Sequence, residues 1–88
     1  MRERIIKGDC WVHVFNGSTF SGKGRRLGRG EKERVCAVQS MIVGPGATAE
    51  IVDQKGLEVV KLQPCQLVTN LSKLVANTPA FRVEVKEA

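Results

Sequence analysis

Short apolar and polar stretches alternate along the chain, and turn residues separate them. Val12 and Val14 fall on one face of an extended strand and Phe15 ends it on the opposite face, because side chains in a strand alternate. A cluster of turn residues at 16–19 follows, and a basic, strand-like run comes after Gly22. These features predict a β-hairpin in which the chain folds back tightly at Gly22.

The rest of the chain predicts more short strands and no long helix. The charged, glycine-broken segment at 28–34 is typical of a loop, and alternation further along puts Ala49 and Ile51 on one face of a strand. About eight short strands with turns between them favour an all-β sandwich or barrel. The segments expected to be extended are 11–15, 23–27, 35–38, 40–43, 47–52, 57–62, 65–68 and 81–85, with a helical turn at 70–75 and a short edge strand or frayed tail at 5–6.

The second half of the chain repeats the order of the first half: strand, glycine-containing turn, strand, loop and final strand. Gly22 and Gly56 hold corresponding places, as do the segments 41–43 and 83–85. An internal duplication of about 40 residues would place two like motifs around a pseudo-two-fold axis with one shared core. The predicted organisation is a single domain, 1–88, with motif one at about 9–45 and motif two at about 46–87.

Three residues of the first motif point to a known family. Phe15 is followed seven positions later by Gly22, and Ser40 opens the final strand of the motif. With this spacing the chain resembles a βγ-crystallin domain, which is built from two Greek-key motifs. The resemblance extends over nearly the whole chain and implies an all-β sandwich of two Greek-key motifs.

The second motif departs from the family pattern. Val52 stands at the aromatic position, the turn at 53–56 is about three residues shorter, and Arg82 occupies the serine position. The resemblance implies that Ser40 hydrogen-bonds the backbone of the folded hairpin and that each final strand pairs into the sheet of the partner motif. The residues that it marks as scaffold, without a functional role of their own, are Phe15, Gly22, Ser40 and Gly56.

Many domains of this family bind calcium through a stretch with two Asp or Asn residues and later Ser or Thr hydroxyls, which are hard oxygen ligands. The corresponding stretches here, 35–40 and 77–82, contain no carboxylate, and Arg82 would put a positive charge beside the ion. We therefore expect neither a calcium site nor another cofactor. The oxygen-bearing residues left near these positions are Gln39, Ser40, Asn77 and Thr78.

The net charge of +5 is concentrated in the first 34 residues, whereas the rest of the chain is neutral. Such a basic cluster attracts phosphates or acidic proteins, or forms a solvated surface that keeps the protein soluble, and the second interpretation is preferred. Trp11 and His13 are expected on the outward face of the first strand, either as a contact surface or as a patch under the N-terminal tail. The candidate partner or phosphate contacts are Trp11, Lys23, Arg25, Arg26, Arg29, Lys32 and Arg34.

The sequence offers little chemistry for catalysis. His13 is the only histidine, and no nucleophile lies next to it in the sequence. The segment 17–24 nearly matches a phosphate-binding loop, but Gly24 replaces the required hydroxyl residue and the residues after it are poor helix formers. We therefore predict that the protein is not an enzyme.

Cys10, Cys36 and Cys65 are odd in number and form no CxxC pair, which favours free thiols in a reducing compartment. A single disulfide or an oxidised dimer are the alternatives. The chain has no apolar run near the length of about 18 residues that a membrane span needs, and no signal-type apolar stretch follows its first residues. The prediction is a cytoplasmic protein without a membrane segment.

These observations predict a non-enzymatic structural or protein-interaction domain that docks a protein partner or its own copy. The alternative is a small basic β-barrel that binds nucleic acid through the arginine-rich segment 23–34, with Trp11 or Phe20 available for stacking. The low aromatic content argues against this alternative. A third interpretation, a secreted toxin or protease inhibitor, conflicts with the absence of a signal and with the odd cysteine number.

Overall fold

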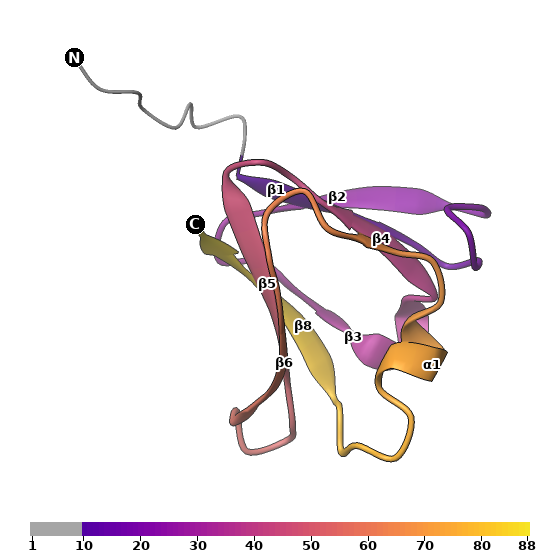
Figure 1. The fold of residues 1–88 in the computed structure, drawn as a ribbon, viewed down its shortest axis with the longest axis vertical. Coiled ribbons are helices and arrows are strands. Elements are labelled where there is room, and N and C mark those ends of the chain that lie inside the picture. Colours follow the sequence, from indigo (N-terminus) through magenta and orange to yellow (C-terminus); the bar gives the residue numbers. More distant parts are fainter. Residues whose placement is uncertain (1–9) are drawn as a thin grey trace.

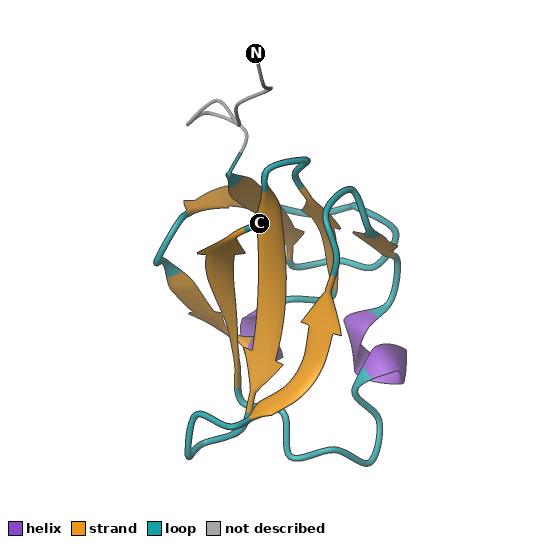
Figure 2. Ribbon diagram, turned by 60° about the vertical axis from the view of Figure 1, so that its left-hand side comes forward, coloured by secondary structure: helices purple, strands orange, loops and turns teal. Residues whose placement is uncertain are grey.

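The computed structural model describes residues 10–88, and within this part of the chain eight strands form two layers (Figures 1 and 2). Each layer is a four-stranded antiparallel sheet, and residues 10–88 also form one α-helical turn and one 3-10 turn. The elements are β1 (Trp11–Phe15), β2 (Gly24–Gly28), β3 (Lys32–Arg34), η2 (Val35–Ala37), β4 (Ser40–Val43), β5 (Ala47–Val52), β6 (Glu58–Leu62), β7 (Leu67–Val68), α1 (Leu71–Leu74) and β8 (Arg82–Glu87).

The two sheets exchange one strand each. Sheet A has the order β2-β1-β4-β7 and sheet B has the order β3-β8-β5-β6, so the third strand of each motif lies in the sheet of the other motif. The expectation that each final strand would pair into the sheet of the partner motif is wrong, because β4 and β8 pair with the first strands of their own motifs. The final strands bury apolar side chains and therefore take central positions, whereas the short third strands suit the edges.

Two predicted boundaries in the first motif are also wrong. The apolar segment 35–38 was expected to be a strand, but η2 forms there, closed by the Val38 N–H that donates to Val35 O at 3.0 Å. The charged residues before it, expected in a loop, form β3. An edge strand paired only with β8 tolerates charge, because Lys32 and Arg34 point to solvent. The expected strand at 5–6 lies outside the described residues.

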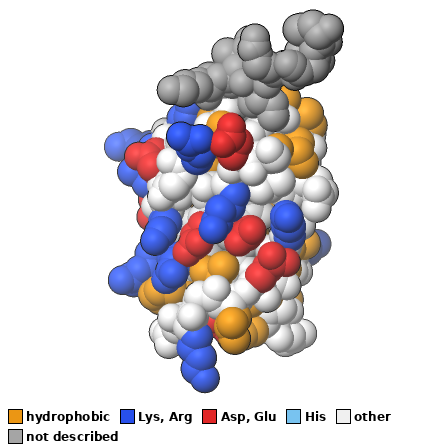
Figure 3. Space-filling view, turned by 90° about the vertical axis from the view of Figure 1, so that its left-hand side faces the viewer, with side chains coloured by type: hydrophobic (Ala, Val, Ile, Leu, Met, Phe, Trp, Pro, Cys, Tyr) orange, Lys and Arg blue, Asp and Glu red, His pale blue; other side chains and the backbone are white. Residues whose placement is uncertain are grey.

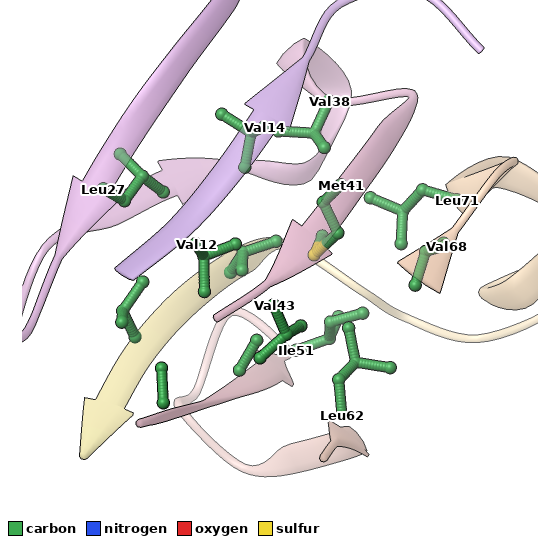
Figure 4. Packing of buried hydrophobic residues seen from close by; sticks show 14 of the residues in the cluster. Val12, Val14, Leu27, Val38, Met41, Val43, Ile51, Leu62, Val68 and Leu71 are labelled. Carbon is green, nitrogen blue, oxygen red and sulfur yellow. The ribbon is translucent and has the colours of Figure 1, made fainter. Parts of the chain in front are cut away.

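The core lies between the two sheets (Figure 4). Val12 and Val14 point inward from β1, Met41 and Val43 point inward from β4, and Ile51 faces them from β5. Full burial of side chains of this size stabilises the fold by about 1.5–3 kcal/mol each. The strand faces that alternation assigned to Val12, Val14 and Ile51 are therefore the buried ones. The other buried apolar residues are Cys10, Leu27, Val38, Ala47, Ala49, Val52, Leu62, Val68, Leu71, Val83 and Val85.

The hairpin between β1 and β2 folds over the start of β4 and is held there by Ser40, which is fully buried. The Phe20 N–H donates to Ser40 Oγ at 2.9 Å, and the Ser40 hydroxyl donates to Gly17 O at 2.6 Å. Gly22 has a φ of +79°, and a side chain there would overlap Asn16 Oδ1. Asn16 Oδ1 also accepts a hydrogen bond from the Lys23 N–H at 2.9 Å, so the close approach of Gly22 to Asn16 is part of the turn.

The hairpin between β5 and β6 is shorter and has no such serine. Asp53 Oδ1 accepts hydrogen bonds from the N–H groups of Lys55 and Leu57, both at 2.9 Å, and Gly56 takes the left-handed backbone with φ +86°. Arg82, at the position that corresponds to Ser40, donates instead from Nε to Glu84 Oε2 at 2.7 Å. The second hairpin therefore closes on itself and is not tied down over its sheet.

The predicted helical turn near residue 70 is confirmed as α1. Asn70 caps it, because its side chain accepts from the Lys73 N–H at 3.3 Å. Leu71 is fully buried, and its N–H donates to Gln39 O at 2.7 Å, which links α1 to the start of β4. These contacts place α1 at the end of sheet A, next to β7.

Candidate interaction surface

The outer face of sheet A carries a row of side chains that crosses all four strands. Trp11, His13 and Phe15 alternate with the buried valines of β1 and are half-buried on the outer face. His13 lies opposite Arg26 of β2 on one side and Ile42 of β4 on the other. The row continues to β7, where the residue opposite Ile42 is a leucine, Leu67, that is 59% exposed.

The aromatic rings on this face are packed against one another and against glycines. The rings of His13 and Phe15 stack with centroids 4.7 Å apart and planes 19° apart, and Phe20 meets Phe15 edge-on at 5.9 Å. A Cβ at Gly24 would lie 2.5 Å from His13 Nε2 and 3.0 Å from the Phe15 ring, so a side chain there would have to displace the stacked rings. The Arg26 guanidinium lies 4.7 Å from the Trp11 ring centroid. The ring faces are thus partly covered by neighbours.

The basic residues predicted as a cluster are dispersed by the fold. Arg25 pairs with Glu33 at 2.9 Å, bridging the edge strands of the two sheets, and Arg29 pairs with Glu87 at 2.8 Å. Arg34 lies over the ring of Phe81, which directly precedes β8 in the same layer, with its Cζ 5.0 Å from the ring centroid. Of the six Lys and Arg residues predicted as contacts, only Lys23 and Lys32 make neither an ion pair nor a cation–π contact with a described residue. Lys23 lies next to β2 of sheet A, and Lys32 lies in β3 of sheet B. The structure therefore does not gather these residues into one phosphate-binding patch.

The carboxylates of residues 10–88 lie on sheet B or in turns, and one of them, Glu31 in the turn between β2 and β3, accepts a hydrogen bond from the Gly28 N–H of β2 at 2.6 Å. The strands of sheet A and α1 contain no Asp or Glu, whereas every acidic residue from 10 to 88 lies on a strand of sheet B or in a turn next to one. The outer face of sheet B carries side chains of both charges, and the Lys86 Nζ atom lies 4.0 Å from carboxylate oxygens of both Glu50 and Glu84. Figure 3 shows this side of the molecule, where Lys and Arg side chains alternate with Asp and Glu. The long acid-free segments are visible in the sequence, but only the sheet order shows that they share a layer.

Three of the four calcium-type positions, Gln39, Ser40 and Thr78, use their side-chain oxygens in internal hydrogen bonds. Ser40 uses its hydroxyl to hold the first hairpin, and Gln39 Oε1 accepts from Ser72 Oγ at 3.2 Å. The Thr78 hydroxyl donates to Val75 O at 2.7 Å. Over residues 10–88, no three His, Cys, Asp or Glu side chains come together as metal ligands do. These residues therefore fit a calcium ion poorly.

The segment 17–24, which resembles a phosphate-binding loop, forms the folded hairpin and leads into a strand, β2, where such a loop leads into a helix. His13 stacks on the Phe15 ring and lies against Gly24 of β2. No helix in this part of the chain is long and apolar enough to cross a membrane.

A pocket of about 570 Å³ lies beside the second hairpin and was not predicted from the sequence. Its walls come from two segments more than 20 residues apart, so no local pattern signals it. Leu57, which is 63% exposed, and Phe81 supply apolar surface, while the Asp53 carboxylate is engaged in the hairpin turn. The lining residues are Asp53, Gln54, Lys55, Leu57, Pro79, Ala80 and Phe81.

The exchange of third strands between two four-stranded units defines a two-Greek-key sandwich of the βγ-crystallin type. A solved structure described under "Evolution of the eye lens beta-gamma-crystallin domain fold" matches with a TM-score of 0.68 at 20% identity. That match covers 91% of this chain and 88% of the other. The crystal structure of Abundant Perithecial Protein from Neurospora crassa also matches with a TM-score of 0.68, at 17% identity.

The second match covers 90% of this chain but only 40% of the fungal protein, so this chain corresponds to less than half of that protein. No protein-family model matches the sequence, and no curated protein sequence matches it. At identities of this level the likeness concerns the fold alone. The chain has the βγ-crystallin domain fold, as the spacing of Phe15, Gly22 and Ser40 predicted.

Proposed function

We propose that this protein is a non-enzymatic, βγ-crystallin-type structural domain that makes protein contacts through the outer face of sheet A. One observation carries the proposal: the strands of this face present aromatic and aliphatic side chains and contribute no carboxylate, whereas the outer face of sheet B carries ion pairs between Lys86 and both Glu50 and Glu84. Aromatic and arginine side chains are favoured in protein interfaces. The cation–π contact between Arg26 and Trp11 supports the proposal, because it holds two such side chains in place before any partner arrives.

Site-specific photo-crosslinking in cells tests this proposal. A benzophenone amino acid is placed at Ile42, on the outer face of sheet A, and in a matched variant at Glu50, on the outer face of sheet B. We expect discrete protein adducts from the first position and few from the second. Equal adducts from both positions, or none from either, contradict the proposal.

Light scattering during size-exclusion chromatography at several concentrations then separates two kinds of partner. A mass that rises with concentration identifies a second copy, and a constant monomer mass identifies a different protein. In both cases the Ile42→Glu variant is expected to lose the contact, because it places a negative charge between His13 and Leu67 in the row of side chains on this face.

Nucleic-acid binding is the second candidate, supported by the acid-free layer that carries Lys23, Arg25 and Arg26. The partly covered ring faces and the Arg25–Glu33 pair weigh against it. Gel-shift experiments with single-stranded and duplex oligonucleotides at low ionic strength test it. A complex that weakens steeply with salt supports this candidate, and no shift at any salt concentration eliminates it.

A further inference from the structure

One edge of sheet A differs from the other three sheet edges of the described chain. The edge strands are β2, β3, β6 and β7, and the first three each carry at least two charged side chains. Charges on an edge strand discourage pairing with another chain. β7 carries none, since it consists of Leu67 and Val68, and its outward-facing leucine is exposed.

A groove of about 330 Å³ runs along β7 to α1. Two of the three exposed large hydrophobic side chains of the described chain line it, Leu67 at 59% and Leu74 at 40% exposure. Leu67 also lies opposite Ile42, so the groove continues into the row of side chains on the outer face of sheet A. The unpaired strand edge and the apolar surface therefore lie side by side.

The charge around the groove has one sign. Lys73 lines it and makes no ion pair with any described residue. Neither the strands of sheet A nor α1 contributes a carboxylate. A second copy docking through its own β7 would bring another lysine and no acid, so the charge disfavours that occupant.

We propose that the β7 edge accepts an extended acidic polypeptide segment, which adds a fifth strand to sheet A. Alternate apolar side chains of the segment pack against Leu67 and Leu74, and its carboxylates lie near Lys73. Main-chain hydrogen bonds provide affinity in this mode of recognition, and the side-chain pockets provide specificity. The inference rests on the proposed protein-contact function and names the chemistry of the partner.

The probe is an acetylated and amidated peptide in which Glu alternates with Val, titrated into ¹⁵N-labelled protein and followed by NMR. We expect the backbone amides of β7 and α1 to shift, with a dissociation constant of about 0.1–1 mM. The same peptide with Lys in place of Glu should bind at least about tenfold more weakly, because its charge matches that of Lys73.

Two leucine variants form a matched pair. Leu67→Asp puts a charge on the β7 edge, and Leu57→Asp changes a leucine of similar exposure beside the second hairpin. Both side chains are largely exposed, so thermal melting should show that both variants remain folded. We expect Leu67→Asp to weaken peptide binding at least about tenfold and Leu57→Asp to leave it within about twofold.

Several results overturn the inference: no amide shift up to millimolar peptide, equal binding by the Leu67→Asp variant, or equal binding of the Lys-containing peptide. Oligothymidine or phosphatidylserine vesicles that shift the same amides more strongly than the peptide also overturn it, in favour of a nucleic acid or a membrane. If the peptide fails while crosslinking from Ile42 succeeds, only the β7 inference is lost. If crosslinking fails as well, the protein-contact function is lost with it.

Discussion

The two hairpins of this domain occupy equivalent places in the two motifs, yet only the first is fastened to its sheet. In the first, buried Ser40 binds the backbone of the hairpin at two points, and Gly22 allows the chain to pass close to Asn16. In the second, Arg82 stands at the serine position and the turn is held only by Asp53. The same sandwich therefore tolerates both a pinned and an unpinned hairpin.

The difference has a consequence for the surface. The pinned hairpin covers the end of sheet A and supplies Phe20 to the aromatic cluster. The unpinned hairpin leaves the pocket beside Phe81 open. The motif that departs from the family pattern thus leaves a pocket beside its hairpin, whereas the first hairpin packs a phenylalanine against sheet A.

Exchanging the two turn glycines for alanine should give the largest contrast. Gly22→Ala is expected to destabilise the fold by about 3 kcal/mol, because it combines left-handed strain with a collision at Asn16. Gly56→Ala should cost about 1 kcal/mol, since it has the same type of backbone but no atom closer than 4.0 Å. Chemical denaturation of both variants measures the difference. Equal losses would show that the first hairpin is no more constrained than the second.

The serine position should give the next largest contrast. Ser40→Ala removes both hydrogen bonds from a fully buried site and should cost about 1–3 kcal/mol. Arg82→Ala removes a partly exposed pair with Glu84 and should cost less than about 1 kcal/mol. In a domain of this size each kcal/mol corresponds to about 4–8 °C in Tm, so thermal melting distinguishes the two. A larger loss from the arginine variant would reverse the assignment of the pinned motif.

The three thiols distinguish the interior from the surface without mutation, because Cys10 is buried whereas Cys36 in η2 and Cys65 in the turn before β7 are exposed. Burial raises the pKa of the Cys10 thiol above its ordinary value of 9.0, the Glu87 carboxylate adds to this, and Arg29 opposes it. The exposed thiols of Cys36 and Cys65 should therefore react first with a disulfide reagent at pH 8, and Cys10 only on unfolding. Early modification of Cys10 would contradict the packing between the sheets.

The same shift predicts a pH dependence of stability. Because the pKa of Cys10 is raised in the folded state, the folded state favours the neutral thiol. The resulting stabilisation is complete below pH 9 and decreases as the pH rises through the raised value. Denaturation of the native protein and a Cys10→Ala variant between pH 7 and pH 10 measures it. The variant should lose this part of the alkaline decline.

Calcium should produce the smallest effect, with no difference between the motifs. The corresponding positions in both motifs lack carboxylates, and Ser40 and Thr78 already use their hydroxyls internally. We expect millimolar calcium to leave the Tm unchanged, with magnesium as the ionic-strength control. A calcium-specific rise in Tm would show that one motif retains a site, and NMR shifts would identify which.

Much of the scaffold could be predicted from local pattern. The inward valines follow from alternation and the fold-back at Gly22 from turn chemistry, and the sequence also indicates the helical turn at 70–75. The strand β3 could not be predicted this way, since Lys32–Arg34 reads as a loop until its pairing with β8 is known. The pocket beside Phe81 was missed for the same reason, as its two walls are distant in sequence.

The sequence by itself determined the alternation, the turns and the two-motif spacing, because each depends on residues a few positions apart. Only the tertiary structure decided which strands are central, that the third strands change sheets and that the strands without acidic residues share one layer. It also decided that the uncharged strand β7 lies at an edge. Strand order depends on pairing between distant segments, and that pairing is fixed by how the whole set of apolar faces can be buried together.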